Sequence, residues 1–230
     1  MSDTIYQAAA LIIPLILAVV FHEVAHGWMA RALGDPTASA LGRLSLNPLK
    51  HVDPIGTILV PGALKLMGLP VFGWAKPVPV VKARLNNPRR DMMLVAAAGP
   101  GSNLILGLIG AVLLGGMIAL LGDWPQGPSL THFAVLNVGN FILLNVFLAV
   151  FNLLPIPPFD GGHIVEGILP RSMEQAWAGL QRMGMLLVIL LIVVLPQIIP
   201  GLDLIGWLVV PPVRWLSEHY IALAHFISGR

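Results

Sequence analysis

Two histidines and a glutamate stand close together in residues 21–30, FHEVAHGWMA. In an α-helix the fourth residue along lies about 40° beyond one full turn, so His22 and His26 project from the same face. Two imidazoles in this relation can share a tetrahedral zinc ion. Glu23, beside them, is then placed to take a proton from water that the metal activates. The spacing therefore predicts metal-assisted hydrolysis.

The surroundings of these three side chains favour a metal site. The pattern fixes only three of five positions and also arises by chance, but here it ends a run of almost pure hydrocarbon side chains, residues 8–21. Ionisable residues inside a membrane span are costly, at roughly 2.5 to 3.5 kcal/mol each for Asp, Lys and Arg, and they usually mark function. A bound cation would compensate for three of them.

A hydrolytic zinc site normally has three protein ligands and keeps one position open, so a third ligand is needed. The chain has no cysteine, which leaves His, Asp or Glu. Asp160 lies in FNLLPIPPFDGGH, residues 151–163, where prolines end a helix and force an extended turn. Such a turn can aim the carboxylate back into a helical bundle, although it could also leave Asp160 facing water. With the histidines in view, Asp160 is the best third ligand.

The composition identifies the elements that must position these side chains. Hydrophobic residues make up 57% of the 230 residues and charged residues 10%, and the mean hydropathy is +0.84. These values predict an all-α polytopic membrane protein of about five to six transmembrane helices, forming one domain over residues 1–230. The net charge is only +2 and the basic residues occupy short loops, so nucleic acid is not expected as a partner.

The apolar runs give an expected order of elements. A region rich in proline and glycine, residues 52–80, predicts a re-entrant or hairpin element after the first span, sheltered by protein because irregular backbone cannot face lipid. Asn87 and Pro88 predict the start of a helix, as its cap and its first residue. The expected spans are residues 5–30, 91–121, 133–154 and 183–200, followed by a short segment at 202–216, so that additional C-terminal helices cover about 183–216.

Charge predicts the orientation. Nine of the thirteen basic residues lie between Arg31 and Arg90, and the loop at 122–132 has none, so the first region is expected in the cytosol and the second outside. The second half of the first span and the chain after residue 152 then lie near one membrane face. The first run has no basic leader and no small-residue cleavage site, so we expect a retained span in a prokaryotic plasma membrane, with the site toward the cytosol.

Two motifs together resemble those of a known family. HEVAH, residues 22–26, and NLLPIPPFDG, residues 152–161, are similar to the two metal motifs of the site-2 proteases, which are intramembrane zinc metalloproteases. AAAGPGSN, residues 96–103, resembles a Gly-Pro and Asn pattern of the same family. The resemblance covers a core of about residues 8–165.

The resemblance implies a function and a set of roles. His22, His26 and Asp160 would bind one zinc ion per chain, Glu23 would act as general base and acid, and Asn152 would lie at the catalytic centre, with a role near the substrate carbonyl. The implied substrate is a membrane-anchored protein, cut in or near its transmembrane segment within the lipid bilayer. It would add as an extended strand beside the 52–80 region. We expect a short form without a PDZ domain or a C-terminal regulatory domain.

The sequence leaves the roles of some further residues, and alternative functions, undecided. Asn103 could contact substrate or serve packing, and His163 could orient Asp160 or face water. Asn137, Asn140 and Asn145 are expected to form hydrogen bonds between helices. The alternative function is a divalent-metal transporter or sensor that uses the same His and Asp ligands, and an inactive scaffold is a third. The sequence carries no signal for an oligomeric state.

Overall fold

The computed structural model describes residues 3–68, 73–122, 125, 127, 129–199 and 201–229. This part of the chain is helical and contains no β-strand, which confirms the all-α prediction. Three helices are long and apolar enough to span a membrane: α1 (Asp3–Ala32), α4 (Pro88–Leu121) and α5 (Leu130–Asn152). A fourth span is added if the bent pair at 171–198 counts as one. The predicted number of five to six is not confirmed by these helices.

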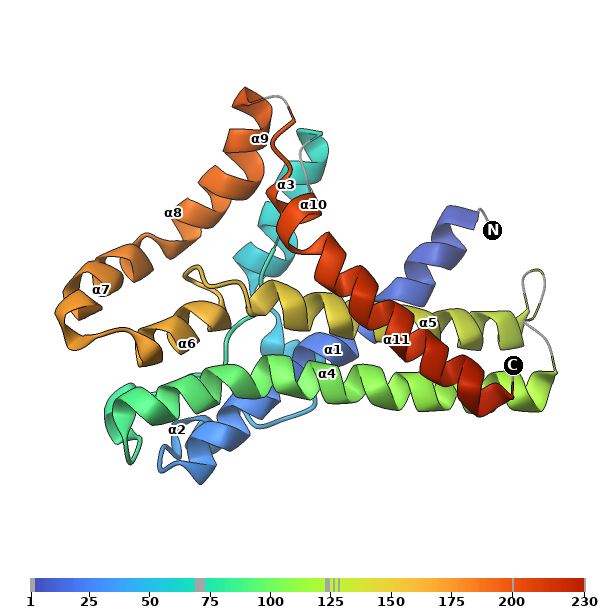
Figure 1. Ribbon diagram of the computed structural model, residues 1–230, viewed down its shortest axis with the longest axis horizontal. Helices are drawn as coiled ribbons and strands as arrows, with labels where there is room; N and C mark the ends of the chain where they lie inside the picture. The colour runs from blue at the N-terminus through green and yellow to red at the C-terminus, as the bar shows by residue number, and fades with distance from the viewer. Residues whose placement is uncertain are drawn as a thin grey trace.

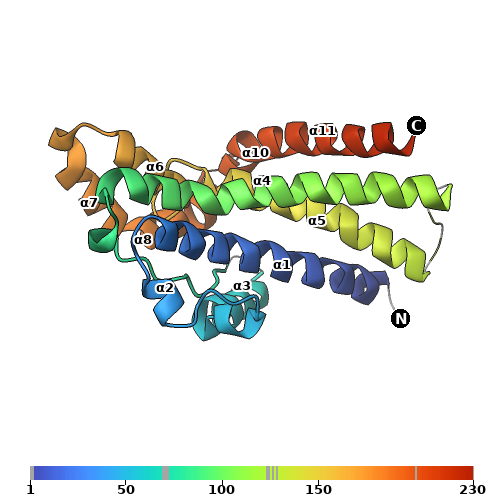
Figure 2. The ribbon, with the colours of Figure 1, turned by 90° about the horizontal axis from the view of Figure 1, so that it is seen from below.

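The three long helices form a bundle in which α4 contacts both α1 and α5 (Figure 1). The C-terminal helix α11 (Val210–Ser228) packs along α4 and α5. Figures 1 and 2 both show α2, α6 and α7 at one end of the bundle, and the end of α4 and the last turn of α11 at the other. The first of these is called the α6 end below.

Proline and asparagine fasten α1 to α5. Pro14 lies inside α1 and has no N–H, so the carbonyl of Ala10, four residues earlier, lacks its usual helical donor. The Asn140 side chain on α5 donates to this carbonyl at 3.1 Å. The hydrogen bond predicted for Asn140 between helices is present, and it satisfies a backbone group that lipid could not. Asn137 differs from the prediction, because its amide bonds the Phe133 carbonyl of its own helix.

The start of α4 is at Pro88, as predicted, but the cap differs. The Asn87 side chain makes no capping hydrogen bond. Instead the Asp91 carboxylate, in the first turn, accepts a hydrogen bond from the Asn87 N–H at 2.7 Å. An acidic group in the first turn also suits the positive end of the helix dipole.

The chain between α1 and α4 goes out as helix and returns as an extended segment. The elements are α2 (Thr37–Ala40), η1 (Pro48–His51), η2 (Pro54–Leu59), α3 (Val60–Leu66) and η3 (Lys82–Arg84). Two hydrogen bonds hold the extended segment to η2: Trp74 N–H donates to Gly56 O at 3.1 Å, and Thr57 Oγ1 donates to Trp74 O at 2.9 Å. This shape fits the predicted hairpin element, of which residues 69–72 lie outside the described residues.

After α5 the chain forms α6 (Asp160–Ile168), η4 (Arg171–Met173) and α7 (Glu174–Arg182), and then α8 (Gly184–Val188), η5 (Ile189–Val194) and α9 (Leu195–Ile198). Figure 1 shows α7 to α9 as an arm that leaves the bundle. The predicted end of the C-terminal segment at residue 216 was wrong. After α10 (Leu204–Leu208), α11 continues to Ser228, because Val213 and Ala224 are buried against α4 and α5 while its polar residues lower its hydropathy. Residues 123, 124, 126 and 128 of the predicted external loop lie outside the described residues.

Candidate metal site

Three side chains from two distant parts of the sequence converge beside the bundle. The Nε2 atoms of His22 and His26 are 3.1 Å apart. Asp160 brings its Oδ2 to 3.2 Å from the first and its Oδ1 to 3.3 Å from the second. Among the described residues this is the one cluster of three His, Asp or Glu side chains close enough to hold a metal ion.

The spacing of these atoms fits zinc. Ligand atoms about 2.0 to 2.1 Å from a tetrahedral zinc lie roughly 3.3 Å from one another, and the separations here are 3.1, 3.2 and 3.3 Å. The Oδ2 of Asp160 is buried and, despite its nearness to His22, has no hydrogen bond of acceptable geometry. A buried carboxylate oxygen that lies beside a ring nitrogen without a hydrogen bond is a suitable ligand for a cation.

Hydrogen bonds on the far side of each ring fix its orientation. Asn103 donates both of its amide hydrogens, to Ala18 O at 3.1 Å and to Asn145 Oδ1 at 2.8 Å, which leaves its Oδ1 to accept from His22 Nδ1 at 2.6 Å. The Val95 carbonyl lies 2.7 Å from His26 Nδ1. With both Nδ1 atoms facing acceptors, the rings must carry their protons there, and both Nε2 lone pairs are free for a metal.

Gly99 on α4 makes room for the two rings. A Cβ at this position would lie 2.4 Å from the Cε1 and Nε2 of His26 and 2.7 Å from the Cε1 of His22. No side chain fits there unless the imidazoles move. No local sequence pattern distinguishes Gly99 or the Val95 carbonyl as part of a metal site. The glycine before Pro100 was a signal only for close packing.

Asp160 is the first residue of α6, and the turn before it is held by an aromatic contact. Phe159 is buried, and its ring meets the ring of Phe151 on α5 edge-on, with 4.5 Å between centroids. Trp177 on α7 donates to the Gly162 carbonyl at 3.1 Å. The proline-rich turn thus ends α5 and returns the chain, as expected, but it passes directly into a helix at Asp160.

A cavity of about 660 Å³ opens beside the three candidate ligands. Its walls come from α1, the segment 73–82, the first turns of α4, the end of α5 and residues 158–166, with Gln181 and Met185 from the arm. Glu23 lines it, and the Oε2 of Glu23 accepts a hydrogen bond from the Val78 N–H at 2.8 Å. Asn152 also lines it, with its amide bonded to Leu148 O of its own helix at 2.9 Å.

His163 lies in the cavity wall but is bonded away from Asp160. Its Nδ1 is 3.3 Å from Glu166 Oε2, and Glu166 also pairs with Lys82 at 2.6 Å and Gln181 at 3.0 Å. Burial raises the pKa of Glu166, but these partners, Lys82 first, lower it more, so the pKa lies below its ordinary value. The structure therefore places His163 in a cluster that joins η3, α6 and α7, and not against the carboxylate of Asp160.

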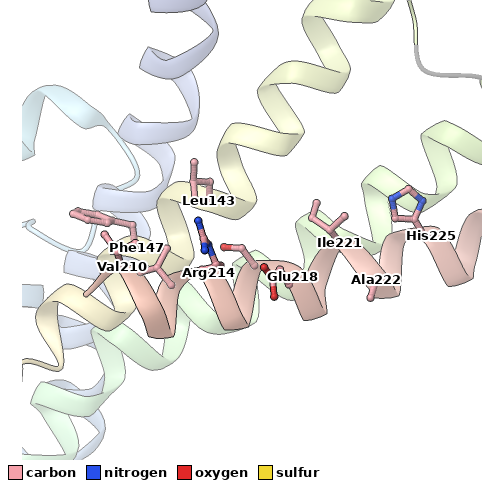
Figure 3. A pocket seen from close by; sticks show the side chains of 10 residues that line it. Leu143, Phe147, Val210, Arg214, Glu218, Ile221, Ala222 and His225 are labelled. Carbon is pink, nitrogen blue, oxygen red and sulfur yellow. The ribbon is translucent and has the colours of Figure 1, made fainter. Parts of the chain in front are cut away.

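A second cavity, of about 640 Å³, lies between α5 and α11 (Figure 3). Figure 3 shows apolar side chains such as Leu143, Phe147 and Ile221 along it, with Arg214 and Glu218 on α11. No group of three His, Asp or Glu side chains that could hold a metal lies there among the described residues, whereas the first cavity has such a group. We therefore assign the chemistry to the first cavity.

Known proteins that resemble this chain are peptidases or are named as zinc metalloproteases, in agreement with a metal site here. The family model described as peptidase family M50 matches residues 10–120 and 114–195. A Bacillus subtilis protein named "Putative zinc metalloprotease YwhC" is 41% identical over 187 residues, which are 80% of this chain and 80% of that protein. A Mycolicibacterium smegmatis protein named "Putative zinc metalloprotease Rip2" is 30% identical over 77% of this chain and 64% of that protein. A Mycobacterium tuberculosis protein of the same name is 31% identical over 94% of this chain and 77% of that protein.

No solved structure matches this chain. The family model nevertheless covers both metal motifs, and the relatives are similar along most of the chain. The two histidines and the aspartate that the fold brings together agree in type and number with the three protein ligands of a catalytic zinc site. The chain belongs to peptidase family M50, the site-2 protease family, and is a metalloprotease.

Proposed function

We propose that this metalloprotease is an intramembrane endopeptidase that hydrolyses peptide bonds in or near the transmembrane segments of membrane-anchored proteins. The observation that carries the proposal is the position of the ligand cluster. His22 and His26 belong to a helix that is apolar enough to span a membrane, and Asn103 on a second such helix bonds the first of them. A cavity built on these helices is accessible to a substrate that is itself in the bilayer.

We assign His22, His26 and Asp160 as the ligands of one zinc ion per chain. A zinc ion held there would supply the positive charge that activates water and polarises a peptide carbonyl. Glu23 lines the same cavity, and its Oε1 is left free when its Oε2 accepts from Val78. As general base, Glu23 takes a proton from the attacking water and, as general acid, gives it to the nitrogen of the leaving amine.

We assign Asn152 the role of a hydrogen-bond donor to the substrate carbonyl. Its side chain lies in the cavity wall at the end of α5, eight residues before Asp160. The amide now bonds a backbone carbonyl one turn earlier in its own helix, which already has a helical donor, so little is lost when the amide turns into the cavity. A donor placed where negative charge develops stabilises the transition state.

The basic residues support a cytosolic position for the site. Basic residues occur in the last turn of α1 (Arg31), the first turn of α4 (Arg89, Arg90), η4 (Arg171) and the last turn of α7 (Arg182). These parts of the elements lie near the α6 end of the bundle. By the positive-inside rule this end faces the cytosol. The relatives named above are bacterial, which favours the plasma membrane. Counting α7–α9 and α11 as two further crossings beside the three long helices would give five.

The test is cleavage in a membrane. Wild type and Glu23→Gln are each reconstituted in lipid vesicles with a panel of tagged single-span membrane proteins, and mass spectrometry locates any cut. We expect wild type to cut within or a few residues outside a span, on the side that bears the basic loops, and Glu23→Gln to cut none. Cleavage confined to water-soluble parts of the panel, or equal rates for both enzymes, would contradict the proposal.

A further inference from the structure

The extended segment that returns from α3 is fixed beside the second half of α1 by its backbone (Figure 2). Lys76 N–H donates to His51 O at 2.8 Å, and the Arg43 guanidinium donates to the carbonyls of Lys76 and Pro77 at 3.0 and 3.2 Å. Val81 N–H donates to the Asp35 carboxylate at 2.6 Å. The segment is therefore held at both of its ends, and residues 77–80 lie between these anchors.

The sequence of this segment leaves it very few amide hydrogens. It reads KPVPVV over residues 76–81, so Pro77 and Pro79 have none, and Val78 carries the single N–H between them. A residue before proline is restricted to extended conformations, and an extended helix of the polyproline type repeats every three residues. Val78 and Val81 are three apart, and each N–H meets a carboxylate, of Glu23 and of Asp35.

The surface of α1 is shaped to receive Val78. Its side chain is 6% exposed. Gly27 lies one helical turn after Glu23, and a Cβ there would come within 2.8 Å of Val78 Cγ1 and 2.4 Å of Leu44 Cδ2. The missing side chain at Gly27 thus lets the segment approach α1 closely enough for the Val78 N–H to reach Glu23.

We propose that the backbone N–H of Val78 positions Glu23 for catalysis. It binds Oε2 and so restrains a flexible side chain, and it leaves Oε1 to exchange the proton with water and the leaving amine. Val78 is a positioning residue, since it acts through Glu23 and through its backbone only. This inference rests on the proposed function, in which Glu23 is the general base.

Proline substitution at two matched positions tests the hydrogen bond from Val78 N–H to Glu23, which we call the tether. Val78→Pro removes the N–H that binds Glu23, whereas Val80→Pro removes an N–H that has no protein acceptor among the described residues. We expect Val78→Pro to lower kcat at least tenfold on a panel protein that wild type cuts, with KM and zinc content unchanged. Val80 lines the same cavity, so Val80→Pro can affect activity too, but it should lower kcat by much less than Val78→Pro does. Val78→Ala keeps the N–H and trims the side chain, so its kcat should be clearly higher than that of Val78→Pro.

A substitution could also disturb folding, so a second measurement uses the unaltered segment. In residues 78–81 amide hydrogens are carried by Val78, Val80 and Val81, and hydrogen exchange should find Val78 and Val81 slow and Val80 fast. In Glu23→Ala the Val78 amide should become fast while Val81 stays slow. An unchanged Val78 amide in that variant would overturn the tether, and this result needs no substrate.

The outcomes separate the two proposals. If wild type cuts, Glu23→Gln does not, and Val78→Pro matches Val80→Pro in kcat, the tether is wrong and the proposed function stands. A rise in KM with kcat unchanged in Val78→Pro would equally overturn the tether, because the segment would then serve substrate binding alone. If wild type and Glu23→Gln cut at equal rates, the proposed function fails, and the exchange result still decides whether the hydrogen bond exists.

Discussion

His22 and His26 stand on a helix of 30 residues, and a neighbouring helix bonds the far side of both rings, whereas Asp160 stands at the start of a helix of nine residues. The histidine half is supported by buried hydrogen bonds and by the bare surface of Gly99. The aspartate half is supported by the packing of Phe159 and by contacts among α6, α7 and η3. Changes on α4 are therefore expected to disturb metal binding directly, whereas changes around α6 are expected to have little effect on the ligand positions.

The largest effect is expected at Gly99. Gly99→Ala places a Cβ 2.4 Å from the His26 ring. Overpacking of this kind costs roughly 1 to 3 kcal/mol, and because the strain falls on the ligands, zinc affinity should drop by up to about 100-fold. Competition with a chelator measures it. Gly101→Ala, where a Cβ would meet nothing within 4 Å, is the control and should bind zinc like wild type. Equal affinities for the two variants would show that α4 does not shape the site.

A comparable effect is expected at Asn103. Asn103→Ala removes the acceptor of His22 Nδ1 and so frees the ring. Loss of such a supporting group typically costs roughly 10- to 100-fold in metal affinity. Asn140→Ala is a matched control, since it removes another hydrogen bond to α1 that does not touch the histidines. Both variants should lose some thermal stability, but only the first should lose zinc affinity; a similar loss in both would assign the effect to helix packing.

A pH effect is expected where the extended segment meets the end of α1. Burial raises the pKa of Asp35, but hydrogen bonds from Thr37 and from Val81 N–H lower it more, to below its ordinary value of 3.8. The charged form therefore stabilises the folded state above about pH 4, and this stabilisation is lost as the pH falls through the lower folded pKa. Melting temperatures at pH 3 to 6 should show less acid sensitivity in Asp35→Asn. An unchanged acid sensitivity would mean that other carboxylates cause it.

The smallest effect is expected at the ion pair of Lys82 and Glu166. The two groups are 2.6 Å apart, but the Lys82 side chain is 42% exposed. Pairs of this kind contribute about 0.2 to 1 kcal/mol, so Lys82→Ala should lower Tm by only a few degrees at most. Zinc binding should not change. A marked loss of zinc in this variant would show that the aspartate half depends on charge at η3 more than on the packing of Phe159.

Local and long-range features of the molecule differ in how far the sequence could predict them. The three long helices were predicted to within about three residues, because unbroken apolar runs leave no other structure in lipid. The i, i+4 histidines and the proline-flanked aspartate stood out by local spacing and by the absence of cysteine. These are signals within short stretches of the chain.

Other features depend on contacts between distant residues. That the Val95 carbonyl meets His26, or that Val78 meets Glu23, follows from how α4 and the extended segment pack on α1, and no local pattern encodes it. The prediction for the end of α11 was wrong because its polar residues lower the mean hydropathy of a helix whose apolar face packs on α4 and α5. The bend of 68° in the arm likewise has no marker that separates it from a straight span.

The zinc content of purified wild type, Glu23→Gln and Asp160→Ala tests the central claim most directly, because it needs no substrate and joins both halves of the site. We predict about one zinc per chain in wild type, the same in Glu23→Gln, and a large loss in Asp160→Ala, since one of three protein ligands is removed. Zinc that is absent from wild type, or that is indifferent to Asp160, would contradict the account.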